Sequence, residues 1–395
     1  MIYFDHAATT PVDPRVFEKM KPYFTENFGN PNSQHSYGRR TVTAVDDARD
    51  TVARLIGAKP NEIYFTSGGT ESDNWALRGA AHAYANKGKH LIVSAVEHPA
   101  VLSAAKELQK EGFEVTFAAV DEYGTVDLAK LKEAIRPDTT LIGVMTANNE
   151  IGTLQPVREI SALARERGIL FFTDAVQAAG AMPLNVREPG VDMLSFSGHK
   201  FYGPKGVGVL YVRSGLRIGK LIAGGHQERS MRGGTTNVPG VVGLAEAFRL
   251  ANEEMAQNNA HVAALRDRFI ARVLREIPYV KLNGHPKNRL PNNANFSFRY
   301  IEGESLLFSL DLAGIAVSSG SACSSGSLEP SHVLLATGLP EGLAHGSIRF
   351  SFGKENTAEE VDFAVDKLKE IVVRLRALSP LFPKELKNEV YEKEI

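Results

Sequence analysis

Short apolar runs rich in β-branched and aromatic residues recur along the first half of the chain, and segments with helical spacing separate them. Between two of these runs, residues 156–168 carry apolar side chains at intervals of three and four, as in an amphipathic helix. Continuous apolar strands that alternate with such helices are typical of a mostly parallel sheet with helices on both faces. We therefore predict an α/β fold with a seven-stranded sheet, whose strands lie within residues 61–68, 90–98, 113–120, 141–149, 169–177, 191–200 and 206–212.

The last two runs are joined by too little chain for a crossover helix, so one strand of the sheet should be antiparallel. A long helical pattern over about residues 241–276 leads into a second region. There, residues 357–378 predict a helix that a capping box of Thr357 and Glu360 opens. Strands are expected in this region at residues 292–301, 315–320 and 347–353.

The length of the chain, 395 residues, exceeds what a single hydrophobic core usually serves. We predict a large α/β domain at residues 15–257. Residues 1–14 and 258–395 would form a smaller α+β domain, with the N-terminal segment packed against it.

Charge and cysteine content exclude several classes of protein. The 45 basic and 46 acidic residues are scattered along the chain, which leaves no basic footprint for nucleic acid or an anionic membrane surface. No apolar run approaches the roughly 20 residues of a membrane helix, and the N-terminus does not resemble a signal peptide. The single cysteine cannot form an intrachain disulfide, which favours a reducing compartment. We expect a cytoplasmic protein.

Polar residues follow five of the predicted strands at the point where each strand ends. Because ligands of open parallel sheets bind outside the carboxyl ends of the strands, these residues predict a binding site. They are Thr70 and Glu71, Glu97 and His98, Asn148 and Asn149, Asp174 and Gln177, and Ser197, His199 and Lys200.

The stretch "SGGTES" at residues 67–72 is the best candidate for a phosphate site. Glycines and a threonine at a helix N-terminus expose backbone N–H groups to an anion, although an ordinary helix cap has the same composition. Two other phosphate motifs are excluded. Pro204 stands where a P-loop requires lysine, and "GPKGVG" precedes a strand whereas a dinucleotide fingerprint follows one.

Lys200 and Asp174 narrow the choice of ligand. A buried lysine can form a Schiff base, and a carboxylate beside a pyridine nitrogen keeps that ring protonated. Together with a phosphate cup, they match the requirements of pyridoxal 5′-phosphate. The alternatives are a solvated lysine in a turn and a metal site. The 11 histidines are dispersed without ligand spacing, which argues against a metal.

Ten motifs in one order resemble the NifS/IscS-type cysteine desulfurases of the class V aminotransferase superfamily. The resemblance runs from Tyr3 to about residue 375 and implies a homodimeric, pyridoxal-phosphate-dependent fold-type I enzyme. Such an enzyme converts L-cysteine to L-alanine and passes the sulfur to iron–sulfur cluster assembly or thio-modification. The motifs are "YFDHAATTPVDP", "GNPNSQH", "FTSGGTESDN", "EHPAV", "NNEIGTLQP", "TDAVQAAG", "SFSGHKFYGPKGVGVLYV", "RGGTTNVPG", "SSGSACSSGSLEPSHVL" and "GSIRFSFG".

The resemblance also implies a role for each residue of the cofactor site. Lys200 would form the Schiff base, Asp174 would face the pyridine nitrogen and Gln177 the phenolate oxygen of the ring. His98 would stack on the ring and assist proton transfer. Other residues would bind the phosphate, with Thr235 reaching it from the neighbouring subunit; they are Gly69, Thr70, Ser197, His199 and Thr235.

The same resemblance also implies which residues bind the substrate and which residue accepts its sulfur. Asn149 and Arg349 would hold the carboxylate of L-cysteine, and Asn149 would also contact the cofactor. The lone thiol, Cys323, stands in "SSGSACSSGS", a composition that predicts a mobile surface loop at about residues 317–330. An isolated cysteine is usually inert, but here loop and family position agree on a sulfur nucleophile.

Some features depart from the family or leave alternatives open. Asn32 replaces a serine of many relatives, and the C-terminal segment after about residue 378 matches no family ending, so the identity of the sulfur-accepting scaffold stays open. The long segment between Cys323 and Arg349 resembles the subgroup that hands sulfur directly to a scaffold. The rival functions are a selenocysteine lyase, a class V transaminase, and a scaffold-binding module without chemistry.

Overall fold

The computed structural model describes residues 1–188, 190–319 and 329–383. Its large sheet has the order β2-β8-β7-β6-β5-β3-β4. β8 runs antiparallel to both neighbours, and the other neighbouring pairs are parallel. The strands are β2 (Ile63–Thr66), β3 (His90–Ser94), β4 (Glu114–Ala118), β5 (Thr139–Gly143), β6 (Leu170–Asp174), β7 (Met193–Ser197) and β8 (Gly208–Val212). The predicted seven-stranded sheet with one antiparallel strand is confirmed.

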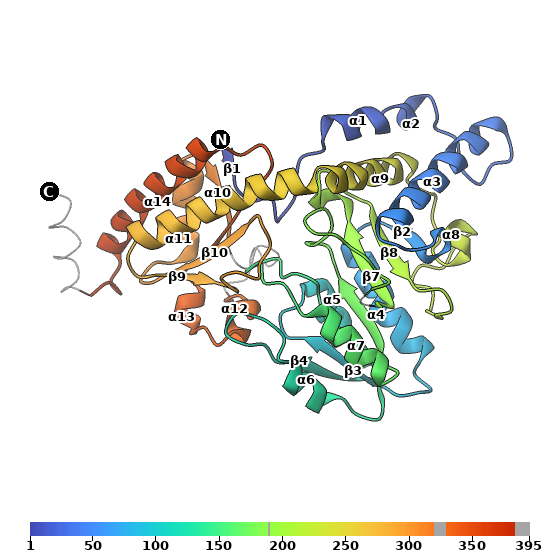
Figure 1. Cartoon of the computed structure of the whole chain (residues 1–395), viewed down its shortest axis with the longest axis horizontal. Helices are drawn as coiled ribbons and strands as arrows, with labels where there is room; N and C mark the ends of the chain where they lie inside the picture. Colours follow the sequence, from blue (N-terminus) through green and yellow to red (C-terminus); the bar gives the residue numbers. More distant parts are fainter. Residues whose placement is uncertain (189, 320–328, 384–395) are drawn as a thin grey trace.

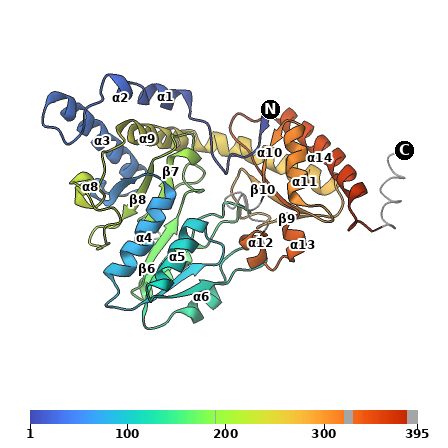
Figure 2. The same cartoon turned by 180° about the vertical axis from the view of Figure 1, so that it is seen from behind.

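Helices cover both faces of the large sheet because both faces of its strands are apolar. Along β3, Leu91 and Val93 pack into one core and Ile92 into another, and Phe171 and Phe172 of β6 divide in the same way. One core lies under α4 (Gly69–Ala83) and α5 (Pro99–Lys110), and Figure 2 shows both helices on the same face. The opposite face is covered by α3 (Ser36–Leu55), α7 (Val157–Glu166) and α9 (Val238–Glu253).

A second, smaller sheet is antiparallel with the order β12-β13-β10-β9. Its strands are β9 (Val280–Asn283), β10 (Asn293–Phe298), β12 (Ser318–Ser319) and β13 (Ser347–Ser351). Helices α10 (Met255–Glu276), α11 (Gly303–Leu312) and α14 (Ala358–Leu378) supply apolar residues to its core, to which Phe4, Phe269 and Phe350 also belong. The N-terminal β1 (Ile2–Tyr3) pairs with β11 (Ile315–Ala316) beside it.

Short elements complete the fold. On the large-sheet side they are α1 (Pro14–Met20), α2 (Pro22–Thr25), η1 (Pro60–Glu62), α6 (Leu128–Ala134), η2 (Gly198–Lys200) and α8 (Gln227–Ser230). Two further short helices, α12 (His332–Ala336) and α13 (Glu341–Ala344), follow the second internal gap in the described chain.

The helix predicted over residues 241–276 is two helices, α9 and α10, which meet at Glu254. Figures 1 and 2 show α10 leading from α9 on the large sheet to α14 on the small sheet. The predicted capping box is confirmed: the Thr357 hydroxyl accepts from the Glu360 N–H, and the Glu360 carboxylate accepts from the Thr357 N–H. The predicted domain limits at residues 15–257 stay a prediction. Among the described residues, no helix is long and apolar enough to cross a membrane.

Candidate active site

The predicted site residues stand at the carboxyl ends of neighbouring strands. His98 follows β3 as the N-cap of α5, Asn149 follows β5, and Asp174 ends β6. Ser197 ends β7, and Lys200 ends the single turn η2 that continues it. Since β3, β5, β6 and β7 are adjacent and parallel, these ends meet at one edge of the large sheet.

Lys200 lies against the N-terminal segment of the chain. Its Nζ donates to the carbonyl oxygens of Ala7 and Ala8, both at 2.7 Å, and the Gln177 Nε2 donates to Ala7 O at 2.9 Å. The carbonyl oxygen of His199 accepts from both the N–H and the hydroxyl of Thr10 at 3.0 Å. The N-terminal segment, predicted only to pack against the smaller domain, therefore also forms one wall of the lysine site.

Asp174 is a buried carboxylate with few donors around it. It is 4% exposed, and its Oδ1 accepts from the Val176 N–H at 2.8 Å. Burial raises its pKa to about 6, against the lowering effects of the Val176 hydrogen bond and the Lys200 charge. A buried carboxyl of this kind is stabilised as an anion by a cationic group, such as a protonated ring nitrogen.

Two further buried carboxyls interact electrostatically with Asp174. Burial and the charge of Asp174 raise the pKa of Asp73 on α4, to which the Ser195 hydroxyl donates. Burial raises the pKa of Glu97 to about 8, and the charge of Asp174 adds to this rise. Burial therefore favours the neutral form of both carboxyls, and the negative charge of Asp174 acts in the same direction.

His98 is a neutral imidazole with a defined tautomer. Its Nδ1 accepts from the Ala100 N–H at 3.1 Å, so the neutral ring carries its proton on Nε2. Burial lowers its pKa to about 4, and the charges of Lys200 and His332 act in the same direction.

The beginning of α4 forms an anion cradle. α4 starts at Gly69, and within the described chain its N-cap, Gly68, makes no side-chain cap to the first N–H groups. A Cβ at Gly68 would lie 3.7 Å from the Ser197 hydroxyl, so the start of α4 lies beside the end of β7. Thr70 is exposed on the first turn of α4. The His199 Nδ1 lies 3.1 Å from the Thr9 hydroxyl. The first N–H groups of α4 and the hydroxyls of Thr70 and Ser197 suit a phosphate at this helix N-terminus.

Arg349 and Asn149 present unused polar atoms next to each other. Arg349, on β13, is 2% exposed and donates from Nη1 to Asn149 O and from Nη2 to Asp5 Oδ1, both at 2.9 Å. The Arg349 Nε and the Asn149 Oδ1 are buried without a hydrogen-bond partner among the described residues. Buried donors and acceptors of this kind are normally satisfied, which points to a polar ligand that completes them.

Thr235 stands apart from this cluster. It is exposed and lines a separate hollow with Ser67, Gly206 and Arg232. Arg232 forms a two-pronged ion pair with Glu71 on α4, at 2.8 and 3.0 Å. Thr235 is therefore held near the anion cradle but faces outward.

An unusual turn precedes that segment. Glu228, Arg229 and Ser230 all have left-handed backbone angles, with φ of 44°, 58° and 64°. A buried ion pair between Glu228 and Arg49, at 2.8 Å, holds the turn, and the Glu228 carboxylate also accepts from the Phe65 N–H.

Cys323 lies outside the described residues. The chain that follows it is anchored at two points beside the site. Ser331 donates to the carboxylate of Glu150, the neighbour of Asn149, and the His332 ring lies 2.9 Å from the carbonyl oxygen of Glu97, the neighbour of His98.

Sequence reasoning missed several residues of this site. Asp5, Thr9 and Thr10 belong to the quoted "YFDHAATT" motif, and their cluster of polar residues directly after a strand was a usable signal. Asp73 and Glu150 gave no such signal, because an acidic residue in a helix or loop is usually solvated. In the described part of the chain, no group of three or more histidine, cysteine or acidic residues is arranged to hold a metal ion.

Comparison with known proteins agrees with this geometry. The family model of class-V aminotransferases matches residues 2–363. A "Cysteine desulfurase IscS" of Dictyoglomus turgidum is 55% identical over 96% of this chain and 96% of its own. Among solved structures, a "NifS-like protein" superposes with a TM-score of 0.89 at 40% identity, over 95% of this chain and 100% of that one.

A third relative carries a ligand. The solved structure "SspA in complex with cysteine" has a TM-score of 0.80 at 36% identity and covers 90% of this chain and 100% of that one. The chain therefore belongs to the class-V aminotransferase family and, within it, to the IscS-type cysteine desulfurases.

Proposed function

We propose that this chain is a pyridoxal-phosphate-dependent enzyme that converts L-cysteine to L-alanine and moves the sulfur, as a persulfide on Cys323, to an acceptor protein. The observation that carries the proposal is the meeting of Lys200 and buried Asp174 at adjacent strand ends, beside atoms of Asn149 and Arg349 that have no hydrogen-bond partner among the described residues. The complex of one solved relative with cysteine agrees with this substrate.

The residues present fit the cofactor. The open N-terminus of α4, at Gly69 and Thr70, would hold its phosphate together with Ser197 and His199, while Asp174 would pair with its ring nitrogen. Lys200 would attach it, and Gln177 would face its phenolate oxygen. When bound, pyridoxal phosphate accepts the electron pair left on Cα after deprotonation.

The substrate carboxylate would meet Arg349 and Asn149. Arg349 is held in place by Asp5 and by the backbone of Asn149, so its guanidinium is preorganised. The Arg349 Nε has no hydrogen-bond partner in the described part of the chain, and the substrate carboxylate would supply an acceptor for it.

Proton transfer at Cα falls to Lys200. The lone pair of His98 Nδ1 is engaged by the Ala100 N–H, and its Nε2 carries the proton, so the neutral ring acts as a donor there. The Lys200 amine, when it is not bonded to the cofactor, has a lone pair and stands at the same edge of the sheet, after β7.

The sulfur step is a displacement at the sulfur of the substrate. The Cys323 thiolate attacks that sulfur, the bond between sulfur and Cβ breaks, and Cβ gains a proton to become the methyl group of alanine. The balance is L-cysteine plus enzyme thiol giving L-alanine plus enzyme persulfide. A free thiol at Cys323 requires a reducing location, so a cytoplasmic enzyme is part of the proposal, and an iron–sulfur scaffold is the expected acceptor.

The proposal includes a homodimer. Thr235 faces outward near the anion cradle of its own chain, which suits a contact with the phosphate in a second copy. Mixed Lys200→Ala and Thr235→Ala subunits should then regain activity, because one of the two sites in each heterodimer carries neither lesion. Absence of recovery on mixing contradicts the shared site.

The function is tested by product analysis. Purified protein loaded with pyridoxal phosphate should release alanine and sulfide from L-cysteine with a reducing thiol present, and borohydride should trap the cofactor on Lys200. A transaminase would instead produce a keto acid from an amino donor, and a selenocysteine lyase would leave L-cysteine unchanged. Either of these results overturns the proposal.

A further inference from the structure

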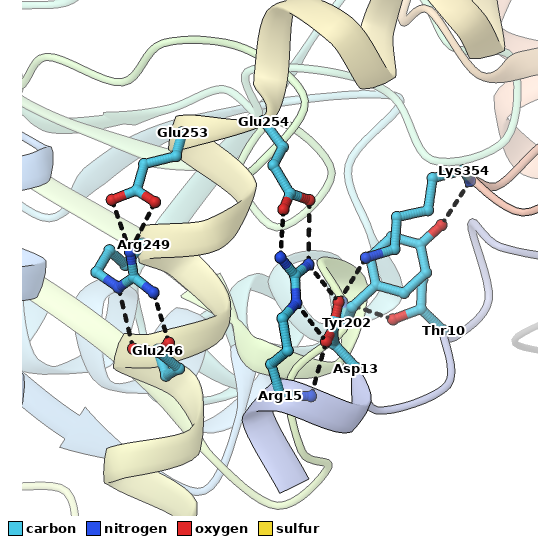
Figure 3. A network of polar contacts seen from close by, with 9 residues as sticks. All are labelled: Thr10, Asp13, Arg15, Tyr202, Glu246, Arg249, Glu253, Glu254 and Lys354. Atoms are coloured by element: carbon cyan, nitrogen blue, oxygen red, sulfur yellow. Dashed lines mark hydrogen bonds and ion pairs between the residues drawn. The ribbon is translucent and has the colours of Figure 1, made fainter. Parts of the chain in front are cut away.

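The chain passes between its two sheets at residues 5–15 and again at Glu254, and a cluster of charges joins both crossings. Figure 3 shows Arg15 between Asp13 and Glu254. Arg15 donates to both oxygens of Asp13, at 3.0 and 2.8 Å, and to Glu254 at 2.5 and 3.2 Å. The two connections are therefore tied to each other.

Lys354 enters the same cluster from the small sheet. It follows β13, the strand that carries Arg349, and its Nζ donates to the Asp13 carboxylate at 2.6 Å. The side chains of this pair are only 18% and 6% exposed. The same ammonium lies 4.4 Å from the centre of the Tyr202 ring, and the Lys354 N–H donates to the Tyr202 hydroxyl at 2.9 Å.

Tyr202 brings the turn of Lys200 into the cluster. It stands two residues after Lys200 in a left-handed conformation with φ of 64°, which a tyrosine adopts only when its surroundings fix it. Its N–H donates to the Thr10 hydroxyl at 2.8 Å, and its carbonyl oxygen accepts from the Asp13 N–H at 3.0 Å. The turn that contains Lys200 is thus held by hydrogen bonds at Tyr202, a residue with a strained backbone.

We propose that Lys354 and Tyr202 are a positioning pair that fixes Arg349 relative to Lys200. This inference rests on the proposed function for the roles of those two residues. β13 pairs with both β10 and β12, and the Gly353 N–H, next to Lys354, donates to the Asn356 side chain at 2.7 Å, so the backbone at Lys354 is held close to the end of β13. Through Tyr202, the same lysine contacts the turn that ends two residues earlier at Lys200.

A substrate held at both points is sensitive to their separation. The amino group of L-cysteine would react at the Lys200 position while its carboxylate contacts Arg349. A shift of one sheet against the other would therefore weaken substrate binding even though each residue is intact. Loss of Lys354 leaves the ion pairs of Arg15 with Asp13 and Glu254 in place, so the two connections between the sheets stay tied to each other.

The test compares Lys354→Met, Lys354→Arg and Arg249→Met. The first removes the charge but keeps an apolar stem, and the second restores a cation over the Tyr202 ring. Arg249 on α9 is the matched control, since it makes ion pairs with Glu246 and Glu253 in the same region but touches neither Lys354 nor Tyr202 in Figure 3.

Lys354→Met should raise the KM for L-cysteine at least about fivefold, with a smaller change in kcat, and Lys354→Arg should recover most of the loss. Arg249→Met should keep the parental KM. If Lys354→Met has the same KM as the parent, or if the control shows an equal rise, Lys354 and Tyr202 do not position Arg349. If Lys354→Met does not accumulate as folded protein, Tyr202→Phe replaces it, because it removes only the hydroxyl that accepts from Lys354.

A second readout needs neither cofactor nor substrate. Amide hydrogen exchange in the cofactor-free protein should be faster at Tyr202 in Lys354→Met than in the parent, and unchanged in Arg249→Met. If Lys354→Met exchanges faster at Tyr202 but the parent protein does not convert L-cysteine, the proposed function has failed while the positioning contact holds. Unchanged exchange at Tyr202 overturns the contact itself.

Discussion

Replacement of Arg349 by lysine tests the substrate site most sharply. The guanidinium spans Asn149 O and Asp5 Oδ1 through two different nitrogens, and its Nε has no hydrogen-bond partner among the described residues. A lysine has one nitrogen, so it cannot keep both anchors and meet a carboxylate as well. One lost hydrogen bond to a charged group is worth about 1.5–3 kcal/mol, which corresponds to a roughly 10- to 150-fold rise in KM for L-cysteine.

The assay is steady-state alanine release over a range of L-cysteine concentrations. Arg289→Lys is the control, because Arg289 is also buried, donates to the carbonyl oxygens of Ile151 and Asn283, and has an Nε without a partner among the described residues. The control should lose stability but keep its KM. If the KM of Arg349→Lys stays within about twofold of the parent, the carboxylate is bound elsewhere.

Three further changes have defined outcomes. Glu228→Ala should lower the free energy of unfolding in urea by about 3–5 kcal/mol, since it leaves Arg49 as a buried, unpaired charge, and a loss below about 1 kcal/mol contradicts this. Burial raises the pKa of Glu150 from 4.5 to about 7, so the folded state keeps a proton that the unfolded state loses. Stability from Glu150 is full below pH 4.5 and declines as the pH rises through 7. Glu150→Gln should therefore flatten the stability profile between these values, and an unchanged slope contradicts the assignment. Asp174→Asn should retain the cofactor but lower turnover at least about 100-fold, as measured by absorbance and alanine release, and parental turnover removes Asp174 from the chemistry.

The large sheet could be predicted from the sequence because both of its faces are buried. Such strands are continuous apolar runs, and β3 and β6 show why, with neighbouring residues such as Phe171 and Phe172 facing different cores. The antiparallel β8 was predictable from the short connection after Lys200 alone. The break at Glu254 was not, because no proline or glycine marks it and α9 and α10 share one apolar pattern.

The strand-end residues of the site were predictable for the same reason, since topology brings them to one edge. The N-terminal wall was not. Ala7 and Ala8 act through their carbonyl oxygens, so their side chains carry no signal of the contact with Lys200. The pairing of Lys354 with Tyr202 depends on how the two sheets are placed, which local pattern does not encode.

In the proposed reaction, the sulfur of L-cysteine passes through Cys323 while the cofactor chemistry takes place at Lys200. Mass analysis of the peptide that contains Cys323, after one turnover with L-cysteine and no reductant, tests it directly. We expect a gain of one sulfur atom on that peptide together with one equivalent of alanine, and neither product from Cys323→Ser protein that still binds the cofactor. Alanine release by Cys323→Ser at the parental rate, or sulfur that never appears on Cys323, would contradict it.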